Sequence, residues 1–164
     1  MGSVTEYPEL ERIGETAQQY PAQYLEGLET GLCLFGAAFS GANDAIHFYE
    51  HGLRTNVVDT DFERLSKMRR LYPDDWQFVH VDAWEYAEAA RREELAFDAV
   101  SVDTFTGDAE IRSLASLELW TSIANELVTV TATPGKPFDV PDGWIVSKHW
   151  RGPGVYWLCL RRSP

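Results

Sequence analysis

The feature that most constrains the fold is a regular alternation of apolar runs with longer amphipathic segments. Five short runs are rich in Val, Leu and Phe, as β-strands are: LCLFG, TNVVD, WQFVHV, FDAVSVD and LVTVTAT. The segments between them have the length and spacing of helices and cover residues 40–52, 61–72, 82–95 and 108–126. Strands that alternate with helices of this length are joined by right-handed crossovers into a parallel sheet. Because the strands show little strict apolar–polar alternation, both faces of the sheet are predicted to be covered.

The pattern changes after Pro134 and Gly135. A polar turn, PGKPFDVPDG, is followed by two apolar runs, WIVSKHW and VYWLCLRR, with only RGPG between them. So short a connection has no room for a helix, and the two runs are therefore predicted to form an antiparallel hairpin.

The segment before the alternation has its own pattern. YPELERIGETAQQYPAQYLEGLETG has the composition of one or two helices, broken by Pro21 and stopped by Gly31. A chain of 164 residues has the length of one domain. We therefore divide it into an N-terminal helical segment, 1–30, that packs on or caps the core, and a core domain, 31–164.

Composition and charge disfavour several classes of protein. A net charge of −12 opposes nucleic-acid binding, which needs clustered Lys and Arg against the phosphates. The sequence contains no apolar run long enough to span a membrane and no signal-peptide pattern at its start, so a cytoplasmic protein is expected. Cys33 and Cys159 lie in apolar strands, as buried reduced thiols do, although a disulfide between them stays open. Apart from His47 and His51, the His and Cys residues have no ligand spacing, so no metal is predicted.

Residues that directly follow the predicted strands are the candidates for a ligand site, because open parallel sheets bind ligands beyond the carboxyl ends of their strands. After the first strand, small residues let the backbone approach a ligand, and N–H groups at the next helix start can bind a polar group. A helix cap formed by Asn43 or Asp44 is the plainer alternative. The candidate contacts in this turn are Gly36, Ala37, Ala38, Phe39 and Gly41.

The second strand ends at Asp59, with Thr60 beside it. Asp59 lies 23 residues beyond Gly36, the interval at which a nucleoside site places an acid that accepts hydrogen bonds from ribose hydroxyls. Capping of the next helix by Asp59 or Asp61 is the alternative, and both interpretations hold if Asp59 binds and Asp61 caps.

Aspartates also end the third and fourth strands. Asp82 can accept an amino hydrogen of adenine, with Ala83 beside it, or it can cap its helix. Asp103 ends the fourth strand. With Asp108 these acids are predicted to crowd one rim of the sheet, where like charges oppose folding unless a ligand or hydrogen bonds compensate.

In this order, LCLFGAAFSG, NVVDTD, FVHVDAWEY and FDAVSVD resemble class I S-adenosylmethionine-dependent methyltransferases. The resemblance covers the chain from about residue 31 to its end, including the hairpin, which that family places at one edge of the sheet. It implies an α/β fold, namely a Rossmann-like, doubly wound, mostly parallel seven-stranded sheet with a C-terminal antiparallel hairpin and helices on both faces.

The resemblance also implies S-adenosylmethionine as cofactor. The turn at residues 36–41 would approach the methionine part, Asp59 would bind the ribose hydroxyls, and Asp82 with Ala83 would meet the adenine. Asp103 would face the methyl-transfer zone.

The sequence departs from the family pattern at specific positions. Leu34 stands where the family has an acid, Ala38 replaces the middle glycine and Ser40 the last, so contact with the cofactor's amino group loses its expected acceptor. DTFTGD after the fourth strand lacks the Asn/Asp-Pro-Pro-aromatic motif, which removes support for nucleobases and glutamine as substrates. The helix usual between the fifth strand and the hairpin is replaced by a turn.

Three functions follow. The first is a methyltransferase acting on a small-molecule or protein acceptor, in which Asp103 orients or deprotonates the acceptor. The second is a degenerate fold that binds a partner or nucleoside without catalysis, which Leu34 and the thinned glycines favour. The third is aminopropyl transfer, as in spermidine synthases, because an acidic rim suits a polyamine substrate. Those enzymes, however, carry extra N-terminal strands that this chain lacks. No motif in the sequence identifies the methyl acceptor. The sequence is also compatible with a homodimer.

Overall fold

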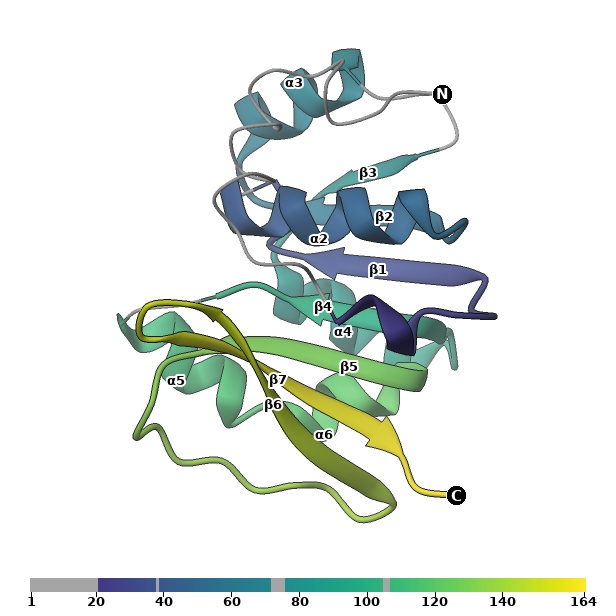
Figure 1. The fold of residues 1–164 in the computed structure, drawn as a ribbon. Coiled ribbons are helices and arrows are strands. Elements are labelled where there is room, and N and C mark those ends of the chain that lie inside the picture. Colours follow the sequence, from purple (N-terminus) through teal and green to yellow (C-terminus); the bar gives the residue numbers. More distant parts are fainter. Residues whose placement is uncertain (1–20, 38, 72–75, 105–106) are drawn as a thin grey trace.

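The protein is built around one mixed β-sheet (Figure 1). The computed structural model describes residues 21–37, 39–71, 76–104 and 107–164, with the side chains of 39–43 excepted. The sheet has seven strands in the order β3–β2–β1–β4–β5–β7–β6. Their bounds are β1 Thr30–Leu34, β2 Arg54–Asp59, β3 Gln77–His80, β4 Phe97–Val102, β5 Ala124–Ala132, β6 Trp144–Gly152 and β7 Val155–Arg162. β1 to β5 pair in parallel, and β7 runs antiparallel between β5 and β6, which confirms the predicted fold and hairpin.

Helices cover both faces of the sheet, as predicted. Helices α2 and α3 pack on one face, and α4, α5 and α6 pack on the other; Figure 1 shows α2 in front of the sheet and α4 behind it. Their bounds are α2 Phe39–Glu50, α3 Phe62–Leu71, α4 Ala83–Arg92, α5 Gly107–Leu114 and α6 Leu117–Ser122, and a short 3-10 turn, η2 Ala22–Tyr24, precedes β1. None of the helices in the described ranges is long and apolar enough to cross a membrane.

Two apolar layers hold the helices to the sheet. Successive strand residues point to opposite faces, so Leu32 and Leu34 join the layer beneath α4–α6 while Cys33 joins the layer beneath α2. Trp120 and Phe48 are fully buried, one in each layer. Both cysteines are free and buried, as predicted, and burial raises the pKa of the Cys159 thiol to about 12.

The predicted helix over residues 108–126 is in fact two helices followed by a strand. α5 ends at Leu114 and α6 begins at Leu117, with Ser116 between them. The Ser116 hydroxyl donates to the Arg112 carbonyl and accepts a hydrogen bond from Trp84 Nε1, so side-chain bonding competes with a continuous helix at this point. The last residues of the predicted helix belong to β5, where Ala124 pairs with Phe97 of β4.

The predicted N-terminal helices lie outside the described residues as far as residue 20. From Pro21 the chain forms η2 and reaches β1 at Thr30, so Gly31 lies inside a strand and the prediction that it ends a helix is wrong. The reason is packing, because a Cβ on Gly31 would lie 2.5 Å from Cδ2 of Phe48. Glycine at this position lets α2 pack directly on β1.

The turn from β1 to α2 is held against β2. The Gly36 N–H donates to the Val58 carbonyl at 3.2 Å. A Cβ on Gly36 would lie 2.7 Å from Val57 Cγ1 and 2.8 Å from the Cys33 carbonyl oxygen. The Cys33 carbonyl belongs to the backbone and cannot rotate away as a flexible side chain can, so an added Cβ would force the backbone to shift.

Gly36→Ala is therefore expected to lower the free energy of unfolding by about 1–3 kcal/mol, as overpacking in a rigid site does. Urea denaturation followed by circular dichroism measures the loss. Gly152→Ala is the matched control, since a Cβ there meets no atom within 4 Å, and it should change stability by less than about 0.5 kcal/mol. Equal losses in the two variants would contradict the steric explanation.

Candidate functional site

Backbone hydrogen bonds join the carboxyl ends of four neighbouring strands. The N–H of Val81, after β3, donates to the Asp59 carbonyl at 3.1 Å, and the Asp103 N–H donates to the Leu34 carbonyl at 3.2 Å. Together with the bond from Gly36 to Val58, these contacts gather the predicted site residues of β1 to β4 at one edge of the sheet. What their side chains do there differs from strand to strand.

Asp59 connects the turn after β1 with the turn after β2. Its Oδ2 accepts the N–H of Ala37 at 3.1 Å, and its Oδ1 accepts the N–H of Asp61 at 3.0 Å. Asp61 in turn accepts the N–H of Arg64, so Asp61 caps α3 and Asp59 does not. A carboxylate has about four acceptor positions, so these two bonds leave Asp59 capacity for further donors. The residue is only 8% exposed, so little of its surface faces solvent.

The predicted contacts of the first turn divide between the turn and the helix. Ala37 is buried, and its N–H is already used by Asp59. α2 begins at Phe39, so Phe39 and Gly41 belong to its first turn and not to the loop before it. Ala38 lies outside the described residues.

Asp44 does not cap α2, contrary to one of the sequence-based alternatives. It lies inside the helix and is fully buried, and its Oδ2 accepts a hydrogen bond from the Ser101 hydroxyl of β4 at 2.5 Å. The acid therefore ties α2 to the centre of the sheet.

Leu34, which stands where an acid was expected, is a core residue with no exposed surface. The next residue, Phe35, has a left-handed φ of 60° and places its ring edge-on against Trp84, with 5.3 Å between centroids. The Arg112 guanidinium lies 3.8 Å over the Trp84 ring. Phe35, Trp84 and Arg112 thus pack on one another between the end of β1 and the end of α5.

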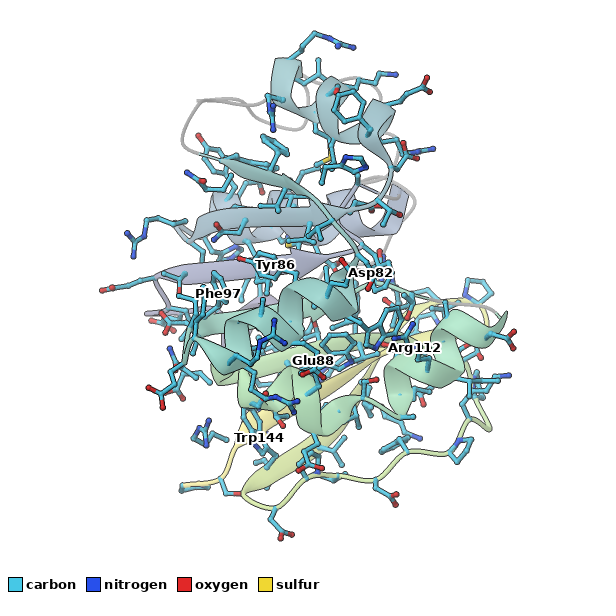
Figure 2. The ribbon with its side chains drawn as sticks, turned by 180° about the vertical axis from the view of Figure 1, so that it is seen from behind. Asp82, Tyr86, Glu88, Phe97, Arg112 and Trp144 are labelled. Atoms are coloured by element: carbon cyan, nitrogen blue, oxygen red, sulfur yellow. The ribbon has the colours of Figure 1, made fainter. Side chains whose placement is uncertain are left out.

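Asp82 is used as a helix cap, the second of its two predicted roles. Its Oδ2 accepts the N–H of Glu85 at 3.0 Å, and Ala83 behind it is buried. Figure 2 shows Asp82 at the start of α4, on the side of the molecule where Arg112 lies. Asp82, Trp84 and Arg112 line one shallow depression of about 960 Å³.

An exposed aromatic pair beside Thr60 escaped the sequence analysis. Phe62 is 62% exposed, and its ring packs on His80 with 5.3 Å between centroids. His80 Nε2 lies 3.0 Å from the carbonyl oxygen of Thr60, which fixes the imidazole beside the end of β2. Phe62 directly follows NVVDTD, and this position after the end of a predicted strand is the signal in the sequence that could have identified the aromatic pair.

Asp103 faces a buried counter-ion. Its side chain has no exposed surface and lies 3.1 Å from Nη1 of Arg151, a β6 residue, in an ion pair. The Thr131 hydroxyl donates to Asp103 Oδ1 at 2.6 Å and also accepts from Arg151. The Arg151 guanidinium lies 4.8 Å over the Trp157 ring. Arg151 stands 48 residues from Asp103, so no local motif could have paired them.

Burial raises the pKa of Asp103 to about 6. The positive charge of Arg151 and the hydrogen bonds from Thr131 and Arg151 act in the opposite direction, while the negative charge of Asp44 adds to the increase. Removal from water therefore outweighs the ion pair in setting the protonation of this carboxyl.

Glu110 is a further buried acid, and it was not predicted from the sequence. Its Oε1 accepts both the N–H and the hydroxyl of Thr133, each at 2.7 Å, so it fastens α5 to the end of β5. Asp108, which was predicted to join the acidic rim, is exposed in the first turn of α5. Among the residues described, no three His, Cys, Asp or Glu side chains gather as metal ligands.

No protein-family model and no curated protein matches the chain. Solved structures are similar to it in fold. A candidate methyltransferase from Escherichia coli has 15% sequence identity and a TM-score of 0.62 over 87% of this chain and 79% of its own. A candidate methylase from Haemophilus influenzae has 15% identity and a TM-score of 0.61 over 96% and 100%.

A further candidate methyltransferase, solved in complex with SAH, has 14% identity and a TM-score of 0.58 over 84% of this chain and 46% of its own. Identities this low establish the fold alone. This chain combines a mostly parallel seven-stranded sheet, an antiparallel C-terminal hairpin and interleaved helices. The chain has the fold of the class I S-adenosylmethionine-dependent methyltransferases.

Proposed function

We propose that the protein binds S-adenosylmethionine at the carboxyl ends of β1, β2 and β3 and transfers its methyl group to a small-molecule or protein acceptor. The observation that carries the proposal is Asp59, an acid at the end of β2 that keeps acceptor capacity while it orders the turns on both sides. The structural neighbour in complex with SAH supports the choice of cofactor.

The residues present fit the nucleoside part of the cofactor. Asp59 offers carboxylate oxygens for the ribose hydroxyls, which are donors of matching chemistry. The exposed ring of Phe62 and the depression beside Asp82 offer apolar and acceptor surface for the adenine. Leu34 offers no acceptor for the amino group of the methionine part, so that contact has to come from backbone carbonyls of the turn.

When bound, S-adenosylmethionine supplies a methyl group activated for attack by a nucleophile. The protein then contributes chiefly by holding the acceptor in line with that group. A general base must come within about 3 Å of the proton it removes, whereas Asp103 is enclosed by Arg151 and Thr131. In this proposal the ion pair of Asp103 with Arg151 holds in place the part of the protein that faces the acceptor. Asp103 can accept a proton from the acceptor only if this ion pair opens.

A nucleoside-binding protein without catalysis is the second candidate. Two observations favour it: the apolar Leu34 at the expected acid position, and the engagement of Asp103 by an internal counter-ion. Aminopropyl transfer has no such support. The acids that suggested it are satisfied within the protein, Asp82 by a helix cap and Asp103 by Arg151.

Calorimetric titration with S-adenosylmethionine and S-adenosylhomocysteine tests cofactor binding. We expect both to bind the wild-type protein, and Asp59→Asn to weaken binding about tenfold or more, because a hydrogen bond to a charged group contributes about 1.5–3 kcal/mol. The absence of binding at millimolar ligand would overturn the cofactor assignment, and an unchanged affinity in Asp59→Asn would overturn the ribose assignment. Methyl transfer to a candidate acceptor then separates catalysis from binding alone.

Asp98→Asn is the matched control. Asp98 also orders backbone, accepting the N–H of Glu29 at 2.7 Å and the amide of Asn125 at 2.9 Å, but it lies at the opposite ends of the strands. Its substitution should leave ligand affinity unchanged. Equal weakening by both substitutions would mean that the loss comes from general destabilisation.

The raised pKa of Asp103 gives stability a pH dependence of definite sign. The native state holds the Asp103 proton more tightly than the unfolded state, so the stability from this group is full below about pH 4 and is lost as the pH rises through about 6. Asn resembles protonated Asp and does not titrate. The free energy of unfolding of the wild type, relative to Asp103→Asn, should therefore fall by about 2 kcal/mol between about pH 4 and pH 6.5, which is most of the full difference expected at 1.36 kcal/mol for each pKa unit.

Urea unfolding at a series of pH values measures this difference, and Asp98→Asn again serves as control. Burial alone would raise the pKa of Asp98, but hydrogen bonds from Asn125, Glu29 and Thr30 lower it. The stability from Asp98 is therefore present above its ordinary pKa and is lost as the pH falls. A pH-independent difference between wild type and Asp103→Asn would contradict the buried titrating acid.

A further inference from the structure

A groove separates α6 and the end of α5 from the connection between β5 and β6. The connection, residues 133–143, has neither helix nor strand, and the groove beside it is half open and measures about 910 Å³. It lies at the start of β6 and the end of β7, at the ends of the sheet opposite to the proposed cofactor site. In Figure 2, Trp144 lies below and to the left of Asp82. We call the groove between α6 and residues 133–143 the connection groove.

Apolar side chains form part of the lining of the connection groove, beside the polar Thr121 and Ser122 of α6. Leu117 and Trp144 are at most 9% exposed and belong to the core, and the partly buried Phe138 packs against the same core from the connection. Val140 is 37% exposed at the rim. The groove thus gives solvent access to side chains that continue into the apolar layer beneath α4–α6.

The rim of the connection groove carries carboxylates that have no cationic partner among the described residues. Glu118 projects from α6, and Asp139 and Asp142 from the connection; all three are exposed, and none forms an ion pair with any residue in the described ranges. Arg162 also lines the groove, but its guanidinium contacts other groups. It donates to the Asn125 carbonyl at 2.7 Å and lies 4.6 Å over the Trp144 ring.

We infer that the connection groove binds a segment of a partner protein in which apolar side chains are flanked by Lys or Arg. Apolar anchors would fill the space between Leu117 and Phe138, and the cations would pair with the carboxylates of the rim. Charge complementarity of this kind raises association rates and rejects acidic partners. A half-open groove along a helix suits a chain segment, whereas sites for small molecules enclose most of their ligand.

This surface is independent of the proposed cofactor site. It shares no lining residue with the strand ends of β1 to β4, and it needs no catalysis. Loss of S-adenosylmethionine binding would therefore leave the inference standing, and failure of the groove would leave the proposed function standing.

Three synthetic peptides of equal length test the inference. One is amphipathic with Leu and Lys, one replaces Lys with Glu, and one replaces Leu with Ser. Fluorescence anisotropy measures the affinities, and amide chemical shifts in two-dimensional NMR spectra of the full chain locate the site. We expect the Leu–Lys peptide to bind at least about tenfold more tightly than either of the others, since both its anchors and its charges are needed. Its shifts should concentrate at residues 114–122 and 137–144.

Because the whole chain carries a charge of −12, general attraction of any basic peptide has to be separated from the groove. The triple variant Glu118→Gln, Asp139→Asn, Asp142→Asn should weaken binding of the Leu–Lys peptide about tenfold, the combined effect of three exposed pairs.

The matched control removes three exposed carboxylates that lie outside the groove, through Glu50→Gln, Glu63→Gln and Glu93→Gln. It has the same net charge as the groove variant and should keep wild-type affinity. An equal loss in the two variants, shifts centred away from the groove, or no binding of the Leu–Lys peptide would each overturn the inference.

Discussion

A buried ion pair connects the two parts of the sheet. Asp103 ends β4, in the parallel part, and Arg151 lies in β6, the outer strand of the antiparallel hairpin, while Thr131 of β5 bonds to both. Removal of one partner from such a pair leaves an uncompensated buried charge, which costs about 3–5 kcal/mol. The position of the hairpin, the end of β5 and the strand-end site therefore depend on one set of contacts. The raised pKa of Asp103 reflects the same burial.

The proposed binding site combines structural and ligand-binding roles in the same side chains. Asp59 orders two turns through separate carboxylate oxygens, and Asp82 caps α4 at the end of the next strand. Both acids would be explained by folding alone. Their joint position at neighbouring strand ends, with the exposed Phe62 packed on His80 between them in the sequence, is an additional feature that supports the proposed nucleoside site. The connection groove, by contrast, has rim carboxylates that have no structural partner in the described part of the chain.

The sequence predicts those parts of the fold that depend on local periodicity. The seven strands and the hairpin follow from apolar runs and turn lengths, and the aspartates at the strand ends follow from their place after each run. Contacts between distant segments leave no local pattern, so the Asp103–Arg151 pair and the hydrogen bond from Thr133 to Glu110 were not predicted. The break between α5 and α6 was missed for a related reason, because it depends on a tertiary hydrogen bond from Trp84 to Ser116. Gly31 resembled a helix stop, but its role is set by Phe48, which packs on it.

The distance along the chain between Asp103 and Arg151 also orders the events of biosynthesis. The ribosome completes the acid 48 residues before it completes the guanidinium that neutralises it. Until then the parallel strands lack the cation that pairs with Asp103 in the folded protein. The hairpin thus supplies the group that completes the interior around Asp103. Chains that stop short of β6 would leave Asp103 without this partner, and less stable chains are removed more readily by cellular proteases.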